Sequence, residues 1–132
     1  MAVKTKGLDI LTEKLSELAN EIGGDLPDRM LDAGAETAEG NWREGIEAAG
    51  HIDTGDMLRS VGTSPYPHSR EIYPQGTDRK GVRNAEKAFI INYGKGKKKG
   101  DRFADKIQKK NEKECYKAMA KVYDDTLKKI TK

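Results

Sequence analysis

Apolar side chains near the start of the chain recur every three or four residues, which is the period of an α-helix. They form one stripe on a helix that ends at the glycine pair at positions 23 and 24. The stripe consists of Leu8, Leu11, Leu15, Leu18 and Ile22. Because it spans only two heptads, we expect it to pack within the domain rather than in a coiled coil.

A second helix follows, starting at Asp25 or Leu26 and ending at Gly50. Pro27 suits its first turn, where a backbone N–H group has no partner within the helix. Its apolar stripe consists of Leu31, Ala35, Ala38, Trp42, Ile46 and Ala49. The alanines, together with Gly34, leave room for a neighbouring helix to come close.

The stretch from Thr54 to Ser60 reads as a short capped elbow between a helical half and an extended half. The Thr54 hydroxyl can accept a hydrogen bond from the first turn of a helix, so we expect it to be the N-cap. Asp56 places a negative charge where the helix dipole favours it. Leu58 and Val61 then fall on one side and can pack inward.

Beyond the elbow the chain becomes β-prone. Residues 61–64 and 70–73 have strand-like composition, and residues 66–69 between them read as a turn. These segments predict a small antiparallel hairpin.

The run from Arg83 to Gly94 fits a helix, with Asn84 as its cap and Gly94 as its end. Its segment Phe89-Ile90-Ile91 would also suit a strand. We favour the helix, because the alanine and aromatic residues of the run share a helical face.

The last segment predicts the longest element. After a flexible basic loop at residues 95–100, a helix capped by Asp101 can extend to about Ile130, which is roughly 45 Å. Its apolar band consists of Phe103, Ile107, Cys115, Ala118, Met119, Val122 and Ile130. A separate column of lysines consists of Lys106, Lys110, Lys113, Lys117 and Lys121.

These elements predict an α+β fold in one domain spanning residues 1–132, with N-terminal helices and a long C-terminal helix packed on a small antiparallel β-sheet. Its parts are a helical part at 7–50, a capped elbow and β region at 51–82, a helix and basic loop at 83–100, and the long C-terminal helix at 101–130. The expected core consists of Leu11, Leu15, Trp42, Leu58, Phe89, Phe103 and Val122. The run Val3–Thr5 is a brief candidate for an edge strand.

Composition limits the size of the core. Hydrophobic residues make up 35% of the chain and charged residues 36%, so we expect a thin core and wide solvated helix faces. No apolar run approaches the roughly 20 residues that span a membrane, and no apolar run follows the basic N-terminus as in a signal peptide. Cys115 is the only cysteine, which excludes an internal disulfide and fits a reducing cytoplasm.

The net charge of +3 hides a strong asymmetry along the chain. Residues 1–50 carry 5 basic and 11 acidic side chains, whereas residues 95–132 carry 14 basic and 6 acidic side chains. A chain with an acidic end and a basic end can pair its own ends or pair head to tail with further copies.

The search for catalytic chemistry finds no constellation. The glycine- and lysine-rich loop lacks the phosphate-loop pattern, since Asp101 follows Gly100 where Lys and Ser or Thr are needed. His51 and His68 lack the further ligands of a metal site, and Cys115 lies in an apolar stripe without a nearby histidine. We therefore expect no enzyme activity, no metal and no cofactor.

The lysine loop and the lysine column have two interpretations. Clustered cations can neutralise nucleic-acid phosphates, but that signal has low specificity and few aromatic residues accompany it. Because the two ends of the chain have opposite charge, we favour contact with protein and do not expect nucleic acid. The expected partner or oligomer interface consists of Lys95, Lys97, Lys98, Lys99, Arg102, Lys106, Lys110, Lys113 and Lys117.

Several short motifs in a fixed order resemble the head–tail joining, or tail-completion, proteins of long-tailed bacteriophages and prophages. The opening is KGLDxL at residues 6–11, and TGxLxxS follows at residues 54–60. Next come a short β region, an alanine-aromatic run ending in Tyr-Gly, and an Arg-Phe start to the last helix. The matching structural positions are Thr54, Gly55, Leu58, Ser60, Ala88, Phe89, Tyr93, Gly94 and Phe103. Arg102 departs from the pattern, which often has proline there.

The resemblance implies a structural, non-catalytic virion protein, assembled in the bacterial host cytoplasm. It implies a place in a ring where the tail meets the head, with other connector or tail proteins as partners and a possible homo-oligomer. The alternative function is a small basic nucleic-acid-binding protein that uses the Lys95–Lys99 loop and the lysine face of the last helix.

Overall fold

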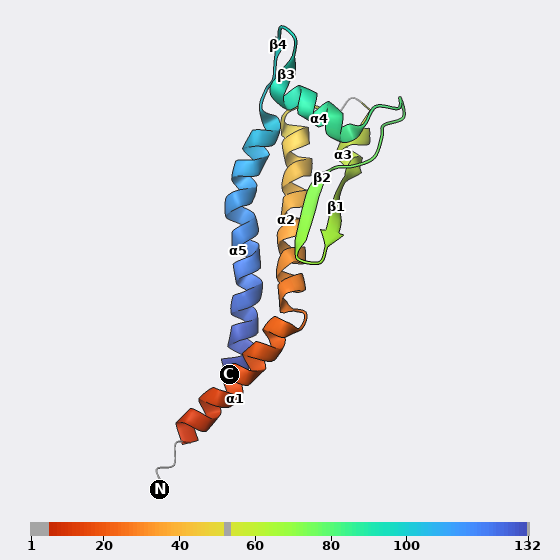
Figure 1. Ribbon diagram of the computed structural model, residues 1–132. Coiled ribbons are helices and arrows are strands. Elements are labelled where there is room, and N and C mark those ends of the chain that lie inside the picture. Colours follow the sequence, from red (N-terminus) through yellow and green to blue (C-terminus); the bar gives the residue numbers. More distant parts are fainter. Residues whose placement is uncertain (1–5, 52–53, 132) are drawn as a thin grey trace.

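Two long antiparallel helices form the body of the protein, and a β-hairpin packs beside one of them (Figure 1). The computed structural model describes residues 6–51 and 54–131. In chain order the elements are α1 (Lys6–Gly23), α2 (Leu26–Ala48), α3 (Asp56–Ser60), β1 (Val61–Tyr66), β2 (Ser69–Pro74), α4 (Asn84–Tyr93), β3 (Gly94–Lys95), β4 (Lys98–Lys99) and α5 (Phe103–Thr131). The expected α+β class is confirmed. The candidate strand at Val3–Thr5 lies outside the described residues.

Helices α2 and α5 lie side by side and run in opposite directions (Figure 1). Small residues on α2 allow this close approach. The Ile107 side chain of α5 occupies the space where a Cβ on Gly45 would stand, and Met119 lies 3.1 Å from the corresponding position at Gly34. Dispersion contacts across this seam stabilise both helices more than their intrinsic propensity does.

A buried pair of asparagines fixes how the two long helices are aligned. The Asn41 side-chain amide donates a hydrogen bond of 2.8 Å to the side-chain oxygen of Asn111. Both side chains are buried. A buried amide without a partner costs about 1–3 kcal/mol, so sliding one helix along the other is disfavoured.

The hairpin of β1 and β2 packs against α2. The strands pair antiparallel, with Val61 opposite Pro74 at one end. The Thr63 hydroxyl donates to the Glu39 carboxylate of α2 over 2.7 Å. Arg70, with only 10% of its side chain exposed, contacts two aspartates of α2, the closer at 3.0 Å. One face of the hairpin is therefore held by polar contacts to the central helix.

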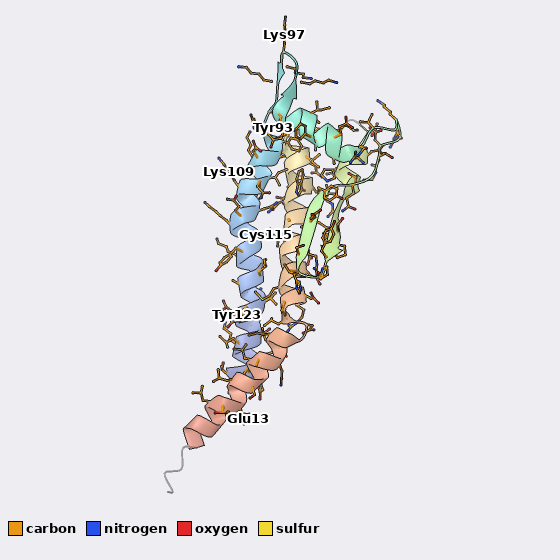
Figure 2. All side chains as sticks on the ribbon, viewed as in Figure 1. Glu13, Tyr93, Lys97, Lys109, Cys115 and Tyr123 are labelled. Atoms are coloured by element: carbon orange, nitrogen blue, oxygen red, sulfur yellow. The ribbon has the colours of Figure 1, made fainter. Side chains whose placement is uncertain are left out.

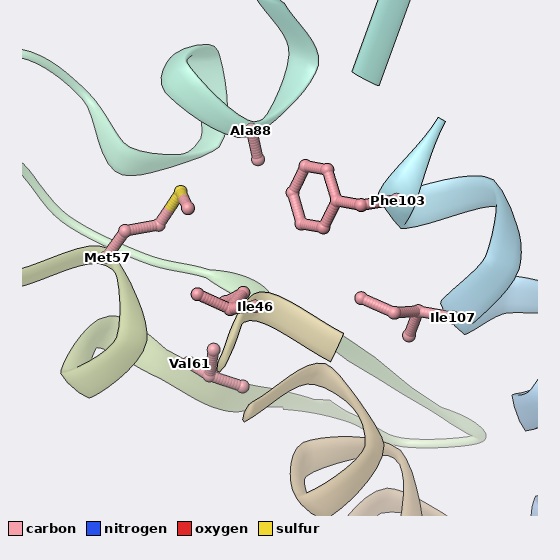
Figure 3. Packing of buried hydrophobic residues seen from close by; sticks show 6 residues of the cluster. All are labelled: Ile46, Met57, Val61, Ala88, Phe103 and Ile107. Carbon is pink, nitrogen blue, oxygen red and sulfur yellow. The ribbon is translucent and has the colours of Figure 1, made fainter. Parts of the chain in front are cut away.

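The hydrophobic core lies at the end of the body that α3 and α4 cover. Its buried side chains come from five elements and converge on one another in Figure 3. They are Ile46, Met57, Val61, Ala88, Phe103 and Ile107. The Phe103 ring meets Trp42 edge-on at a centroid distance of 6.2 Å and His51 at 4.9 Å. Phe103 thus joins the end of α2 to the start of α5.

A side chain from α4 caps the start of α5. Asn92 is 2% exposed, and its side-chain oxygen accepts hydrogen bonds from the backbone N–H groups of Ala104 and Asp105, at 3.0 and 3.2 Å. The first N–H groups of a helix have no partner within it, so a side-chain acceptor stabilises the end. The cap also fixes α4 across the top of the long helices.

The expected core is partly wrong. Phe103 is buried, and Trp42 and Leu58 pack against the buried cluster as partly buried side chains. Leu11, Leu15 and Phe89, however, are 53%, 56% and 62% exposed. The leucines remain exposed because α1 projects from one end of the body and packs only sparsely on α2 and α5 (Figure 1). Phe89 remains exposed because Ala88 and Asn92 occupy the inner face of α4. Val122 is only half-buried.

The structure confirms the β-hairpin and the helix at 84–93, but it differs from several local predictions. The loop at 95–100 is a small antiparallel hairpin, β3–β4, with a turn at Gly96 and Lys97. The N-cap of α3 is Gly55 with φ +81°, although the Thr54 hydroxyl does accept from the Asp56 amide at 3.3 Å. Arg83, rather than Asn84, occupies the N-cap position of α4, without a side-chain hydrogen bond to the helix, and the Asn84 side chain donates to the carbonyl of Gln75.

Among the described helices, none combines the length and apolar character needed to cross a membrane.

We predict that Gly45→Ala destabilises the protein by about 1–2 kcal/mol, as measured by denaturant unfolding. Alanine favours a helix by about 1 kcal/mol over glycine, but overpacking a core costs about 1–3 kcal/mol. Here the overlapping Ile107 side chain is buried and cannot move into solvent.

Gly40→Ala is the matched control on the same helix, since no atom lies within 4 Å of its added Cβ. It should stabilise the protein by about 0.5–1 kcal/mol. Equal changes in the free energy of unfolding for Gly45→Ala and Gly40→Ala would contradict the close contact between Gly45 and Ile107.

Candidate interaction surfaces

The most exposed basic feature is the small hairpin β3–β4. Its four lysines, Lys95, Lys97, Lys98 and Lys99, are all exposed, and Figure 2 shows Lys97 at the outer end of the molecule. Gly94 and Gly96 have φ of +91° and +60°, which favours glycine. A Cβ on Gly94 would overlap the Lys98 carbonyl. The backbone therefore presents the lysines on a defined turn.

Two exposed aromatic rings lie at the base of this hairpin. Phe89 and Tyr93 of α4 are 62% and 50% exposed, and their ring centroids lie 4.7 Å apart. The Arg102 guanidinium lies 5.0 Å from the centroid of the Tyr93 ring, within the range of a cation–π interaction. We call Phe89, Tyr93 and Arg102 the aromatic patch. Such rings next to cations are typical of contact surfaces.

The predicted lysine column runs down α5 but does not form one uniform surface. Lys110 lies at the seam with α2 and contacts Glu44 at 3.0 Å and Glu114 at 3.9 Å. The hydrogen bond that Lys110 donates to Glu44, followed by the charge of Glu114, raises the pKa of Lys110 above its ordinary value. Lys113 and Lys117 are exposed.

Arg102 and Lys106 connect the column to the hairpin end of the molecule. Arg102 forms an ion pair of 3.2 Å with Asp105, and Lys106 is exposed. The predicted interface residues therefore divide into an outer group on the small hairpin and a group along the helix. Within the helical group, Lys110 is already paired inside the chain.

Among the described residues, no ion pair joins the lysine column of α5 to the acidic column that Glu13, Glu17 and Glu21 form along α1. Among the side chains that the structure describes on α1, Glu21 forms an ion pair of 2.8 Å with Arg29 of α2. Figure 2 shows Glu13 near the outer end of α1, far from Lys109 on α5. Both charged columns therefore face solvent over much of their length.

The motif residues of the elbow have structural roles. Gly55 begins α3, and the Ser60 hydroxyl donates to the Met57 carbonyl over 2.6 Å. Leu58 packs against the core cluster. Thr54 accepts from the amide of Asp56, which lies at the centre of a polar network.

Asp56 holds the elbow to the loop that follows β2. Its carboxylate accepts hydrogen bonds from the Arg79 guanidinium at 2.9 Å and from Arg59 at 2.7 Å. Hydrogen bonds from Arg79 are the main cause that lowers the pKa of Asp56 far below its usual range. Nothing in the spacing of the sequence marks Arg79 as this partner, because a hairpin separates the two residues.

The remaining motif positions divide between the core and the surface. Ala88 and Phe103 are buried, whereas Phe89 and Tyr93 are exposed in the aromatic patch. Arg102, where the family pattern often has proline, has φ +60°. A proline ring fixes φ near −65°, so the turn into α5 follows a path that proline cannot adopt.

The surroundings of His51 and Cys115 indicate structural roles for both side chains. The His51 ring contacts the Asp101 carboxylate and packs on Phe103. Burial, followed by the charge of Glu114, raises the pKa of the Cys115 thiol, which disfavours the reactive thiolate. Within residues 6–51 and 54–131, no group of three or more potential metal-ligating side chains is found. Ile52 and Asp53 of the His51-Ile52-Asp53 motif lie outside the described residues.

An apolar groove of about 660 Å³ lies where α1 meets α2. Its lining includes Ile22 at the end of α1, Leu26 and Met30 of α2, and Met119 and Tyr123 of α5. The sequence pattern did not reveal it, because its walls come from three helices and from Pro67 and His68 in the turn between β1 and β2. It continues the exposed stripe of α1 onto the body of the protein.

We predict that Asp56→Asn destabilises the protein at neutral pH, as measured by denaturant unfolding. A carboxylate whose pKa is lowered in the folded state stabilises it above the unfolded pKa of about 3.9. This contribution decreases as the pH falls below that value. The stability difference between the two proteins should therefore shrink below about pH 4. A difference that is constant between pH 7 and pH 3 would contradict the role of the carboxylate charge.

Comparison of the chain with models of protein families, with curated proteins and with solved structures found no match.

Proposed function

We propose that this chain is a non-catalytic virion assembly protein of a long-tailed bacteriophage or prophage. It acts at the junction of head and tail, as a joining or tail-completion protein, through protein–protein contacts within a ring. In this role it is part of the virion and is assembled in the cytoplasm of the bacterial host. Its partners are other connector or tail proteins and further copies of the chain.

The aromatic patch beside the basic hairpin is the observation that carries this proposal. Phe89 and Tyr93 are both at least half exposed, and the hairpin lysines surround the same end of the molecule. Exposed aromatic residues beside Arg are enriched in the buried centres of protein–protein interfaces. An elongated molecule that presents such a patch at one extremity is suited to end-on contact with a larger assembly.

The order of the sequence motifs supports the same function. The elbow at residues 54–60 forms α3 and connects α2 to the hairpin of β1 and β2. Helix α4 ends at Tyr93, and Gly94 begins the small hairpin β3–β4. The motif residues of the elbow and of the run ending at Gly94 therefore lie at the end of the molecule that carries the candidate contact surface, whereas the KGLDxL opening belongs to α1 at the other end.

The proposal predicts that a tagged form of this chain is found in purified particles of the phage or prophage that encodes it. Electron microscopy with a label on the tag should place it at the joint between head and tail. Detection only in the lysate, or a label spread over the capsid, would contradict the proposal.

The hairpin variant Lys97→Gln, Lys98→Gln and Lys99→Gln should reduce incorporation into particles, because it removes three charges from the contact surface. A matched control removes the same charge at the other end of α5, through Lys121→Gln, Lys128→Gln and Lys129→Gln. Unfolding measurements on both variants separate a lost contact from a lost fold.

A second candidate function is nucleic-acid binding by the same hairpin. Four exposed lysines beside a tyrosine ring provide both phosphate neutralisation and a stacking surface. If this function holds, the protein binds DNA with an affinity that falls steeply with salt, and the hairpin variant abolishes binding while the matched control does not. Weak binding that both variants reduce equally would contradict it.

A further inference from the structure

Helix α1 presents an apolar stripe that the rest of the chain leaves uncovered. It projects from the end of the body opposite the basic hairpin (Figure 1). Leu11, Leu15 and Ile22 are 53%, 56% and 51% exposed, whereas Leu18 is half-buried. Their spacings of four, three and four residues follow the a and d positions of a heptad.

An uncovered helix of this kind requires a packing partner. Most helical stability in proteins comes from packing an apolar face rather than from the intrinsic propensity of the helix. Within the described chain, α1 packs on α2 and α5 much less extensively than these two helices pack on each other, and it projects beyond them (Figure 1). The outer part of its stripe therefore gains stability only if another molecule covers it.

We propose that the partner is α1 of a second copy, packed antiparallel about a two-fold axis. In one register Leu11 lies opposite Ile22 of the second copy, and Leu15 lies opposite its Leu18. The two-fold axis repeats both pairs, which gives four apolar layers from two short helices. Each layer joins an a position to a d position, as antiparallel helix pairing requires.

The charges beside the stripe fit the same register. Lys14 and Glu21 both occupy the g position of the heptad, at one edge of the stripe. In the antiparallel register each Lys14 lies across from Glu21 of the second copy, so opposite charges meet twice. In a parallel pair Lys14 would instead face Ala19, and this attraction would be absent. Glu21 has 40% of its side chain exposed beside Arg29, which leaves room for a second cation.

The groove of about 660 Å³ extends the proposed interface. Ile22 belongs both to the stripe and to the groove lining, so the two apolar surfaces are continuous. In the antiparallel register, the N-terminal half of the second α1 lies beside Ile22 and is directed toward the groove. The two-fold axis places the first α1 equally toward the groove of the second copy.

A two-fold contact of this kind is self-complementary and closes as a dimer. The aromatic patch and basic hairpin lie at the other end of each copy, so the dimer leaves them free for different partners. The inference concerns the free protein and does not depend on a place in a virion.

Light scattering at about 100 µM protein should give twice the mass of the 14.6 kDa chain. The variant Leu11→Gln with Leu15→Gln should weaken dimerisation by about tenfold or more, because it removes apolar surface from all four layers. The control Glu13→Gln with Glu17→Gln changes the opposite side of α1 and should leave the mass unchanged. Circular dichroism and unfolding curves should show the body of each variant to be folded.

Disulfide trapping tests the orientation in a Cys115→Ser background. Chains with Leu11→Cys, mixed with chains carrying Ile22→Cys, should form mainly mixed disulfide dimers on oxidation. Dimers of Leu11→Cys with itself would indicate a parallel pair and overturn the register.

Three other outcomes would also overturn the proposal. These are a monomer at the highest concentration, a larger assembly that the stripe variant leaves intact, and a monomer whose stripe binds lipid vesicles instead. Loss of the dimer with normal incorporation into particles would refute this inference while leaving the proposed function intact.

Discussion

The close approach of α2 and α5 at Gly45 positions the side chains that form the core. Ile107 fills the space that a side chain at position 45 would need, and this brings the start of α5 against the end of α2. Phe103, one turn earlier on α5, can then reach Trp42 and enter the core. Since the chain has a thin core, this one region supplies much of the apolar burial that holds five elements together.

Polar side chains help to fix the arrangement of the helices, because the small apolar core does not define it alone. Asn92 caps α5 from α4, Asn41 and Asn111 align the long helices, and Asp56 ties the elbow to Arg79. Each is satisfied by partners from a different element, so a wrong packing of the helices would leave polar groups without partners. Such networks favour one arrangement even where apolar burial is modest.

The two ends of the molecule differ in chemistry. One end carries Phe89, Tyr93 and the lysine hairpin, and the other carries the leucine stripe of α1 with an adjoining groove. Large apolar side chains that remain exposed on an elongated body mark surfaces for association. Because the long helices separate these surfaces, the proposed contact with a second copy and the proposed contact with a different partner would not compete.

The order and type of most elements follow from the sequence, because the helical period, the β-prone runs and the glycine stops are local signals. The sequence also identified the small residues of α2 and the buried Phe103. Which apolar stripes are covered, in contrast, depends on how the helices pack against one another. Leu11 and Leu15 have the same local pattern as buried leucines, and their exposure depends on the angle at which α1 leaves the body.

The candidate surfaces were also predicted only in part from the sequence. The lysine-rich run at 95–99 was evident in the sequence, but its short hairpin depends on backbone pairing between Gly94 and Lys99. The neighbouring aromatic patch was not evident, because Phe89 matched a buried face of α4 equally well. Asn92 takes the inner position instead, since α5 needs an acceptor for its first N–H groups. Periodicity defines the faces of a helix, and only the arrangement of its neighbours determines which face is buried.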